Sequence, residues 1–277
     1  MKIILGKTAG FCWGVKRAME IVDATLTNGA NKVYTSGPLI HNQEVVDRLA
    51  AKGVKAIEDF RRIREGTVII RTHGMPPKTK LRLVKKGLHT VDATCPHVSK
   101  TQKQVEDMAG KGYSVVIVGD PKHAEVVGLV GHASGQAKVV SSIKDARTLA
   151  IKPPIFVAAQ STFSGELFRK VVECLRMRHP DLAVFDSICR SATNRQREVL
   201  EIAKKADAMI VVGGSNSANT RRLAQISKST GRPTFLVENA SQLPLTKLGK
   251  FKKVGVTAGA STPDWAISEV IERLMEL

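Results

Sequence analysis

One pattern of residues occurs three times along this chain, and it constrains the fold more than any other feature of the sequence. Each copy starts with a cysteine where a short apolar run gives way to a helix-like stretch, and a strand ending in a glycine-containing turn follows. A polar residue then stands near a helix start, 28 to 30 residues after the cysteine. The cysteines are Cys12, Cys95 and Cys189, and the polar residues are His41, His123 and, in the third copy, Ser217 and Asn219.

A second strand and turn complete each copy. They bring His73, Gln160 and Ser261 to positions 61, 65 and 72 residues after the cysteine of their copy. Three copies of a unit of about 90 residues predict three lobes. Short β-rich runs alternate with stretches of helical period, which predicts an α/β fold of three pseudo-symmetric lobes, each a small, mostly parallel sheet with flanking helices. The expected lobes are 13–94, 95–188 and 189–277, with residues 1–12 completing the sheet of the third lobe.

The 277 residues carry a formal net charge of +18. This charge is dispersed over many expected helices, only 4% of the residues are aromatic, and no stacking motif is present, which together argue against a dedicated nucleic-acid site. The charge does favour a small phosphorylated substrate or an acidic electron-carrier protein. No apolar stretch has the length of a membrane span and the N-terminus does not read as a signal peptide, so we expect a cytoplasmic protein without a membrane segment.

The cysteines are expected to act as thiolates, because four cysteines in a cytoplasmic chain do not form a disulfide scaffold. Three of them come from similarly built segments far apart in the sequence, which indicates one shared iron–sulfur cluster at the centre of the lobes rather than a local zinc knuckle. Three ligands leave a [4Fe-4S] cluster with one iron open to substrate, which is typical of catalysis. The alternative for a single cysteine is burial as a small apolar residue, and we assign that role to Cys174, inside an amphipathic helix.

Polar residues at the strand-end turns are expected to surround this cluster, because ligands collect where parallel strands end and helices begin. Histidines, hydroxyls and helix N–H groups suit a diphosphate. The residues are His41, His73, His123, Ser217, Asn219 and Ser261. The local sequence of Ser261 fits a helix N-cap equally well. Glu125 is a candidate proton donor, although its spacing alone fits a first-turn helix glutamate better.

Nine segments between residues 10 and 265 resemble the 4-hydroxy-3-methylbut-2-enyl diphosphate reductases, the family that ends the methylerythritol phosphate route to isoprenoids. The segments are GFCWGV, IHNQEVV, RTHGMPP, DATCPHV, GDPKHAEVVG, AQSTFS, DSICRSATNRQ, GGSNSANTRRL and VTAGASTPDW. The resemblance implies a three-lobed α/β fold around one [4Fe-4S] cluster that is held by Cys12, Cys95 and Cys189.

The resemblance also implies a reaction. The substrate hydroxyl would bind the open iron, two electrons would arrive from ferredoxin or flavodoxin, and water would leave to give isopentenyl and dimethylallyl diphosphates. Glu125 would protonate the leaving hydroxyl and the allyl intermediate, with His123 and Ser161 in the proton network. The residues implied to hold the diphosphate are His41, His73, His123, Ser217, Asn219 and Ser261.

Three positions depart from the pattern of this family. Ser161 stands in Gln-Ser-Thr where many members have Gln-Thr-Thr, but it keeps a hydroxyl. Ala218 replaces a serine of the Ser-Ser-Asn motif, which leaves its backbone N–H for the diphosphate, and Ala192 stands where others have threonine. The closest rival is quinolinate synthase, whose three lobes also hold a cluster with an open iron. An iron–sulfur nucleic-acid-binding protein is the alternative from another class.

Overall fold

The computed structural model describes residues 1–277 as an α/β protein. Its strands form three four-stranded sheets, all parallel, in the orders β1-β12-β10-β11, β3-β2-β4-β5 and β7-β6-β8-β9. The strands are β1 (Lys2–Leu5), β2 (Val33–Ser36), β3 (Val54–Ile57), β4 (Thr67–Ile70), β5 (His89–Asp92), β6 (Ser114–Val118), β7 (Lys138–Val140), β8 (Ile155–Ala159), β9 (Ala183–Val184), β10 (Ala208–Val212), β11 (Thr234–Val237) and β12 (Lys253–Ala258). The predicted α/β fold with three small parallel sheets is confirmed.

Helices connect and cover these strands. The α-helices are α1 (Trp13–Thr27), α2 (Gln43–Ala51), α3 (Pro77–Lys85), α4 (Pro96–Gly110), α5 (Ala124–His132), α6 (Ile143–Thr148), α7 (Gly165–Arg176), α8 (Arg190–Ala203), α9 (Ala218–Ser229), α10 (Leu245–Leu248) and α11 (Asp264–Met275). One short 3-10 helix, η1 (Ala240–Gln242), precedes α10. None of these helices combines the length and the apolar character that crossing a membrane requires.

The chain divides into two compact units, and each unit combines segments that are separate in the sequence. The first unit contains Met1–Lys16, Ile40–Arg48 and Arg190–Leu277, and the second contains Arg17–Leu39 and Leu49–Cys189. β1 pairs in parallel with β12, with Lys2 opposite Lys253, so the N-terminal strand lies in the sheet of the C-terminal third of the chain. The boundaries expected near residues 94 and 188 stay a prediction.

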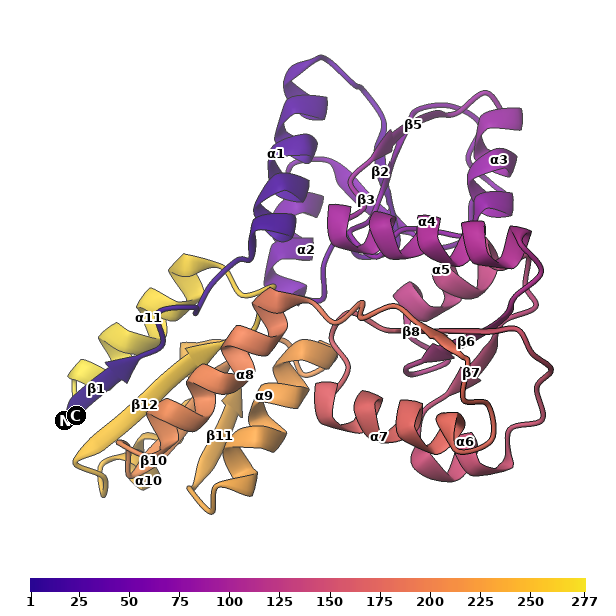
Figure 1. Ribbon diagram of the computed structural model, residues 1–277. Coiled ribbons are helices and arrows are strands. Elements are labelled where there is room, and N and C mark those ends of the chain that lie inside the picture. Colours follow the sequence, from indigo (N-terminus) through magenta and orange to yellow (C-terminus); the bar gives the residue numbers. More distant parts are fainter. The chain divides into compact units, whose positions relative to one another are not determined.

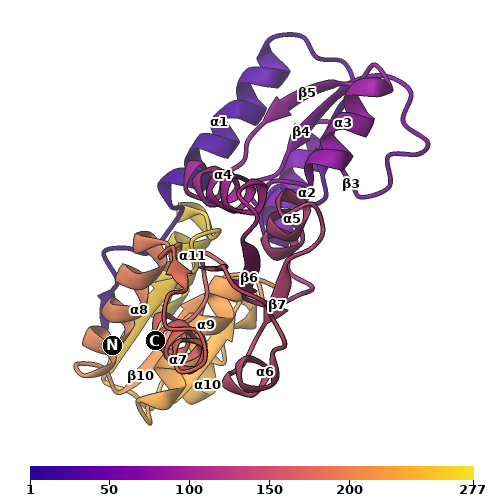
Figure 2. The same cartoon turned by 45° about the vertical axis from the view of Figure 1, so that its right-hand side comes forward.

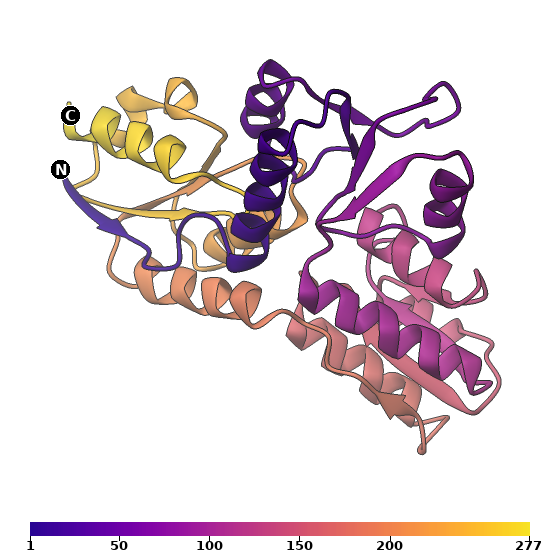
Figure 3. The same ribbon diagram turned by 90° about the horizontal axis from the view of Figure 1, so that it is seen from above.

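The sheet of the first unit is covered on both faces. Figures 1 and 3 show α11 on one side of this sheet and α8 and α9 on the other. Successive residues of β10 point to opposite faces, so Met209 packs in the cluster with Val199 and Leu223, while Ile210 packs in the cluster with Val270. Because both faces are buried, β10 is an uninterrupted apolar run rather than an alternating one.

The same arrangement occurs in the second unit around β6 and β8. Val116 packs with Val171 of α7 on one face of their sheet, and Val115 packs with Val105 of α4 and Leu129 of α5 on the other. The other sheet of this unit is built around β2 and β4. α1 and α3 lie on opposite sides of it (Figures 1 and 2).

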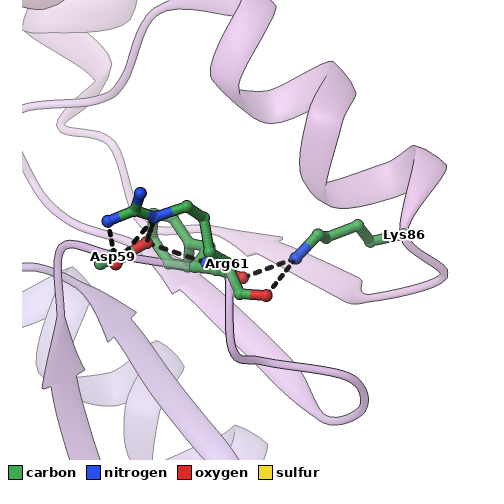
Figure 4. Close-up of polar contacts among 4 residues, drawn as sticks. Asp59, Arg61 and Lys86 are labelled. Atoms are coloured by element: carbon green, nitrogen blue, oxygen red, sulfur yellow. Dashed lines mark hydrogen bonds and ion pairs between the residues drawn. The ribbon is translucent and has the colours of Figure 1, made fainter.

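Hydrogen bonds made by Asp59, Arg61 and Lys86 hold the loop between β3 and β4. Arg61 donates from its backbone N–H and its guanidinium to the Asp59 carboxylate, which lowers the pKa of Asp59 to about 2. Lys86, just after α3, donates to the backbone oxygens of Phe60 and Arg61 at 2.8 and 2.9 Å (Figure 4). The loop is therefore tied to the C-terminal end of α3.

A glycine follows the first strand of each repeat and fixes the turn at its end. Gly37, Gly119 and Gly213 each donate a backbone hydrogen bond to the last residue of a neighbouring strand. Gly37 and Gly213 have φ of 78° and 138°, which a residue with a side chain rarely adopts. The residues four positions later are His41, His123 and Ser217. The predicted polar residues thus stand at equivalent turns, next to the starts of α2, α5 and α9.

Candidate active site

The three cysteines of the repeat occupy the same backbone position, at the N-terminus of a helix. Cys95 is the N-cap residue of α4, and Cys12 and Cys189 directly precede α1 and α8. In each case the cysteine N–H donates to the backbone oxygen of a strand-end turn. The acceptors for Cys12, Cys95 and Cys189 are Ala260, Thr72 and Ser161, at 3.1, 2.9 and 2.8 Å.

These hydrogen bonds correct one detail of the repeat. The residues that follow the three acceptors are Ser261, His73 and Thr162. Thr162, rather than Gln160, therefore matches His73 and Ser261. Gln160 instead makes two side-chain hydrogen bonds. Its Oε1 accepts from the Asp120 N–H at 3.1 Å, and its Nε2 donates to the Thr162 hydroxyl at 2.9 Å. It ties the turn after β6 to the turn after β8.

The chemistry of these three positions fits an iron–sulfur cluster. The side chains of Cys12, Cys95 and Cys189 are half-buried rather than sealed in the core, and none takes part in a disulfide. The positive end of a helix stabilises a thiolate, which is the form that iron binds. Cys174 is different, because it is buried within α7 among the apolar residues of that sheet face. This placement matches the packing role expected for Cys174.

In the first unit, the start of α9 presents polar groups suited to an anion. The Ser217 hydroxyl accepts from the Thr220 N–H at 3.3 Å as the helix N-cap, and the first-turn N–H groups, including that of Ala218, have no acceptor within the helix. Asn219 is only 6% exposed, yet neither its side-chain oxygen nor its side-chain nitrogen has a hydrogen-bond partner. A buried amide without partners is costly, so this position is suited to a polar ligand.

His41 and Ser261 belong to the same unit and touch one another. The Ser261 hydroxyl donates to the backbone oxygen of His41 at 3.1 Å, which holds the turn before α2 against the turn after β12. Ser261 does not cap α11 through its side chain, since the N-cap of that helix is Pro263, without a side-chain hydrogen bond. The N-cap alternative for Ser261 is wrong.

Gly214 allows this close approach. A Cβ atom at this position would lie 2.9 Å from the backbone oxygen of His41 and 2.8 Å from the side-chain oxygen of Asn216. We expect Gly214→Ala to lower the free energy of unfolding by about 1–3 kcal/mol, because a backbone atom cannot move aside as a flexible side chain does. Thermal unfolding would measure this effect. Gly249→Ala is the control, because its Cβ would make only an ordinary 3.6 Å contact, and an equal loss in the control would contradict the prediction.

The segment before Cys12 is held by contacts within the first unit. The Phe11 ring packs edge-on against Trp265, with 6.2 Å between ring centroids, and the Trp265 indole N–H donates to Glu44 at 2.9 Å. The buried Arg195 of α8 donates to the backbone oxygen of Gly10. The loop that precedes Cys12 is thus held by Trp265 of α11 and by Arg195 of α8.

In the second unit, Glu125 is a buried carboxyl group held by one residue. Its side chain is 1% exposed, and Ser161 donates to it twice, from the backbone N–H to Oε1 and from the hydroxyl to Oε2, each at 2.7 Å. The backbone oxygen of the same Ser161 accepts from the Cys189 N–H. One residue therefore links the carboxyl group to a cysteine of the repeat.

Burial raises the pKa of Glu125. The two hydrogen bonds from Ser161 and the charge of His97 act in the opposite direction, but desolvation is the largest effect. A carboxyl group with a raised pKa keeps its proton closer to neutral pH than an ordinary glutamate does. Such a group can act as an acid, a property that the spacing of Glu125 in the sequence did not show.

His123 and His73 belong to the same unit as Glu125, and His123 contacts its backbone. His123 is the N-cap of α5, and its Nδ1 accepts from the Glu125 N–H at 3.2 Å. Because Nδ1 accepts, the proton of the neutral ring is on Nε2, which is then a donor. The His73 and His123 rings meet edge to face, with 5.1 Å between their centroids.

Several residues that support the site were not predicted from the sequence. The His97 ring nitrogen Nε2 contacts the backbone oxygen of Ser187 at 2.7 Å, and the Ser187 hydroxyl both donates to and receives from the Ala159 backbone. Arg195 and Trp265, which hold the loop before Cys12, were also not anticipated. His97 and Ser187 each lie two residues from a cysteine of the repeat, and this proximity was the available signal.

Comparison with known proteins gives one family. Residues 3–275 match the family model described as LytB protein. The chain is 45% identical over 277 residues to the 4-hydroxy-3-methylbut-2-enyl diphosphate reductase of Geotalea uraniireducens, and the match covers 100% of this chain and 98% of the relative. It is 44% identical over 279 residues to the enzyme of the same name from Geobacter metallireducens, with coverage of 100% and 98%.

Two solved structures are similar to this chain. The E-1-hydroxy-2-methyl-but-2-enyl-4-diphosphate reductase of Plasmodium falciparum has a TM-score of 0.93 and 30% identity, covering 98% of this chain and 87% of that one. A structure of (E)-4-hydroxy-3-methyl-but-2-enyl diphosphate reductase, described as the terminal enzyme of the non-mevalonate pathway, has a TM-score of 0.75 and 40% identity, covering 100% of both chains.

Proposed function

Because the chain belongs to the LytB protein family, an oxidoreductase family of isoprenoid biosynthesis, we propose that it reduces 4-hydroxy-3-methylbut-2-enyl diphosphate to isopentenyl and dimethylallyl diphosphates. One substrate molecule takes up two electrons and two protons; its C4–O bond breaks, one C–H bond forms, and one water leaves. The observation that carries the proposal is the buried Glu125 carboxyl group, whose hydrogen-bond partner Ser161 also binds the backbone of Cys189. This link through Ser161 supports the proposal that Glu125 is an acid near a cluster ligand.

Cys12, Cys95 and Cys189 would hold a [4Fe-4S] cluster whose fourth iron is open to substrate. When bound, such a cluster supplies electrons and a Lewis-acidic iron. The support from this chain is that all three thiols are half-buried at helix N-termini and outside disulfides. The fourth cysteine, Cys174, is packed in the core and is left out of the proposed ligand set.

The diphosphate would be held by residues of the strand-end turns. Asn219 supplies both a donor and an acceptor that lack protein partners, and the Ala218 N–H lies in the first turn of α9, where the helix favours a negative charge. The remaining proposed ligands are His41, His73, His123, Ser217 and Ser261.

Glu125 would deliver the protons. Burial raises its pKa, which favours the protonated carboxyl group, and the Ser161 hydroxyl at 2.7 Å can pass a proton onward, since a hydroxyl both donates and accepts. The Nε2–H group of His123 would donate a hydrogen bond to the substrate, and Glu125 would be the acid. The proposed electron donor is an acidic ferredoxin or flavodoxin, and the cytoplasmic location stays a prediction.

The direct test is turnover by anaerobically purified protein. Reduced methyl viologen should be reoxidised only after 4-hydroxy-3-methylbut-2-enyl diphosphate is added, with two viologen molecules consumed per substrate and both diphosphate products present. Iron-free protein with full activity would refute the proposal. So would reoxidation without formation of either product.

Asn219 gives a prediction for substrate binding. We expect Asn219→Ala to raise the KM about 10- to 100-fold with a smaller change in kcat, because a hydrogen bond to a charged group is worth about 1.5–3 kcal/mol. Steady-state kinetics at varied substrate would measure this. The exposed Asn28 offers a control, and a similar KM for wild type and Asn219→Ala would remove Asn219 from the diphosphate site.

Ser161 gives a prediction for the dependence on pH. Activity should fall as the pH rises through the raised pKa of Glu125, because the ionised carboxylate cannot donate. The Ser161 hydroxyl lowers that pKa. In a plot of activity against pH, Ser161→Ala should therefore move the falling limb to higher pH, and it should also reduce the maximal rate. Ser161→Thr keeps the hydroxyl and should keep the limb in place. A shift to lower pH in the alanine variant would contradict this assignment.

A further inference from the structure

An exposed tryptophan stands directly beside one of the three cysteines. Trp13 opens α1 immediately after Cys12, and the residue is 67% exposed. The chain contains only two tryptophans. The other, Trp265, is held by Glu44, Phe11 and Arg48. Tryptophan rings supply a large contact area at protein interfaces, so an exposed ring beside cations is suited to a partner.

Positive charge accompanies this ring. Lys16 follows Trp13 by one turn of α1 and is exposed, and the exposed Arg190 opens α8, which contacts the loop before Cys12 through Arg195 and Gly10. The carboxylate of Glu198, also in α8, accepts hydrogen bonds from the backbone N–H groups of Lys7 and Thr8, so it is already engaged there. We call Trp13, Lys16 and Arg190 the Trp13 patch.

We infer that the Trp13 patch is the docking surface for an acidic protein that carries one electron at a time. Charge complementarity selects this partner, because the patch presents two cations in a chain of net charge +18. Tryptophan and arginine are also the residues that contribute most to binding at protein interfaces. The inference rests on the proposed function, which requires an electron donor.

The position next to Cys12 explains why the patch lies here. A carrier that covers Trp13 lies one residue along the chain from a proposed cluster ligand, which keeps the path for an electron short. Two docking events complete one turnover: each carrier molecule is oxidised by one electron, and one substrate molecule is reduced by two.

Binding can be measured without turnover. The probe is an oxidised acidic bacterial ferredoxin, added to protein labelled with 5-fluorotryptophan. The fluorine resonance of Trp13, assigned with Trp13→Phe, should shift on addition, while that of Trp265 should not. Trp13→Ala and Lys16→Glu should each weaken ferredoxin binding at least tenfold, and added salt should weaken binding by the wild type.

The kinetic arm compares two electron donors. In Trp13→Ala and Lys16→Glu, the KM for reduced ferredoxin should rise at least tenfold, while turnover with methyl viologen stays at the wild-type level. Met275→Ala and Lys250→Glu are controls at other exposed positions of the same unit. An unshifted Trp13 resonance, or an equal loss with both donors, would overturn the docking surface. Failure of the proposed function would appear differently, as absent viologen turnover in the wild type.

Discussion

Replacing Glu125 by glutamine should reduce turnover by about 10²- to 10⁴-fold, the usual contribution of a positioned general acid. Glutamine preserves the local contacts, because its oxygen can accept from the Ser161 N–H and its amide can donate to the Ser161 hydroxyl, replacing the two bonds that glutamate receives. Only the transferable proton is lost. The measurement is kcat with reduced viologen and saturating substrate.

The variant should remain folded and should retain its iron. Thermal unfolding above neutral pH is expected at or above the wild-type temperature, because the amide avoids burying a negative charge. Glu173→Gln, at an exposed position of α7, is the control and should keep full activity. Wild-type turnover in Glu125→Gln would show that the protons come from another group.

The repeat in the sequence was enough to predict the class of fold. Glycine turns after β2, β6 and β10 and cysteines at helix starts are local features, and local features can be recognised from residue type and spacing. The edge strands β3, β7 and β11 were not anticipated, and β5 and β9 were indicated only as short apolar runs before Cys95 and Cys189. In β3 the exposed Lys55 and Ala56 interrupt the apolar pattern, because an edge strand is covered only in part.

The candidate site was predictable as a set of residues but not as a set of contacts. Glu125 was a candidate because it follows His123, and Ser161 entered only through the family resemblance, yet the paired 2.7 Å hydrogen bonds join residues 36 positions apart. Burial, which raises the pKa of Glu125, depends on the packing of the whole sheet and is not encoded by the neighbours of Glu125 in the sequence. The shift from Gln160 to Thr162 in the repeat likewise needed the backbone hydrogen bonds.

Serine at position 12, 95 or 189 should abolish the cluster. Each of Cys12→Ser, Cys95→Ser and Cys189→Ser removes one of only three proposed thiolate ligands, and a serine hydroxyl is a far weaker ligand for iron. We expect anaerobically reconstituted wild type to hold about four irons per chain, and each variant to lose most of that iron, the visible absorbance of the cluster, and turnover by at least about 10²-fold.

Cys174→Ser is the matched control, because it removes the one cysteine that packs in the core. The substitution places a hydroxyl among apolar side chains, so it should lower the free energy of unfolding by about 1–3 kcal/mol while iron content and absorbance stay at the wild-type level. Circular dichroism of the iron-free proteins separates loss of fold from loss of ligand. Full iron content in any of the three variants, or its loss in Cys174→Ser with the fold intact, would show that the ligand set is wrong.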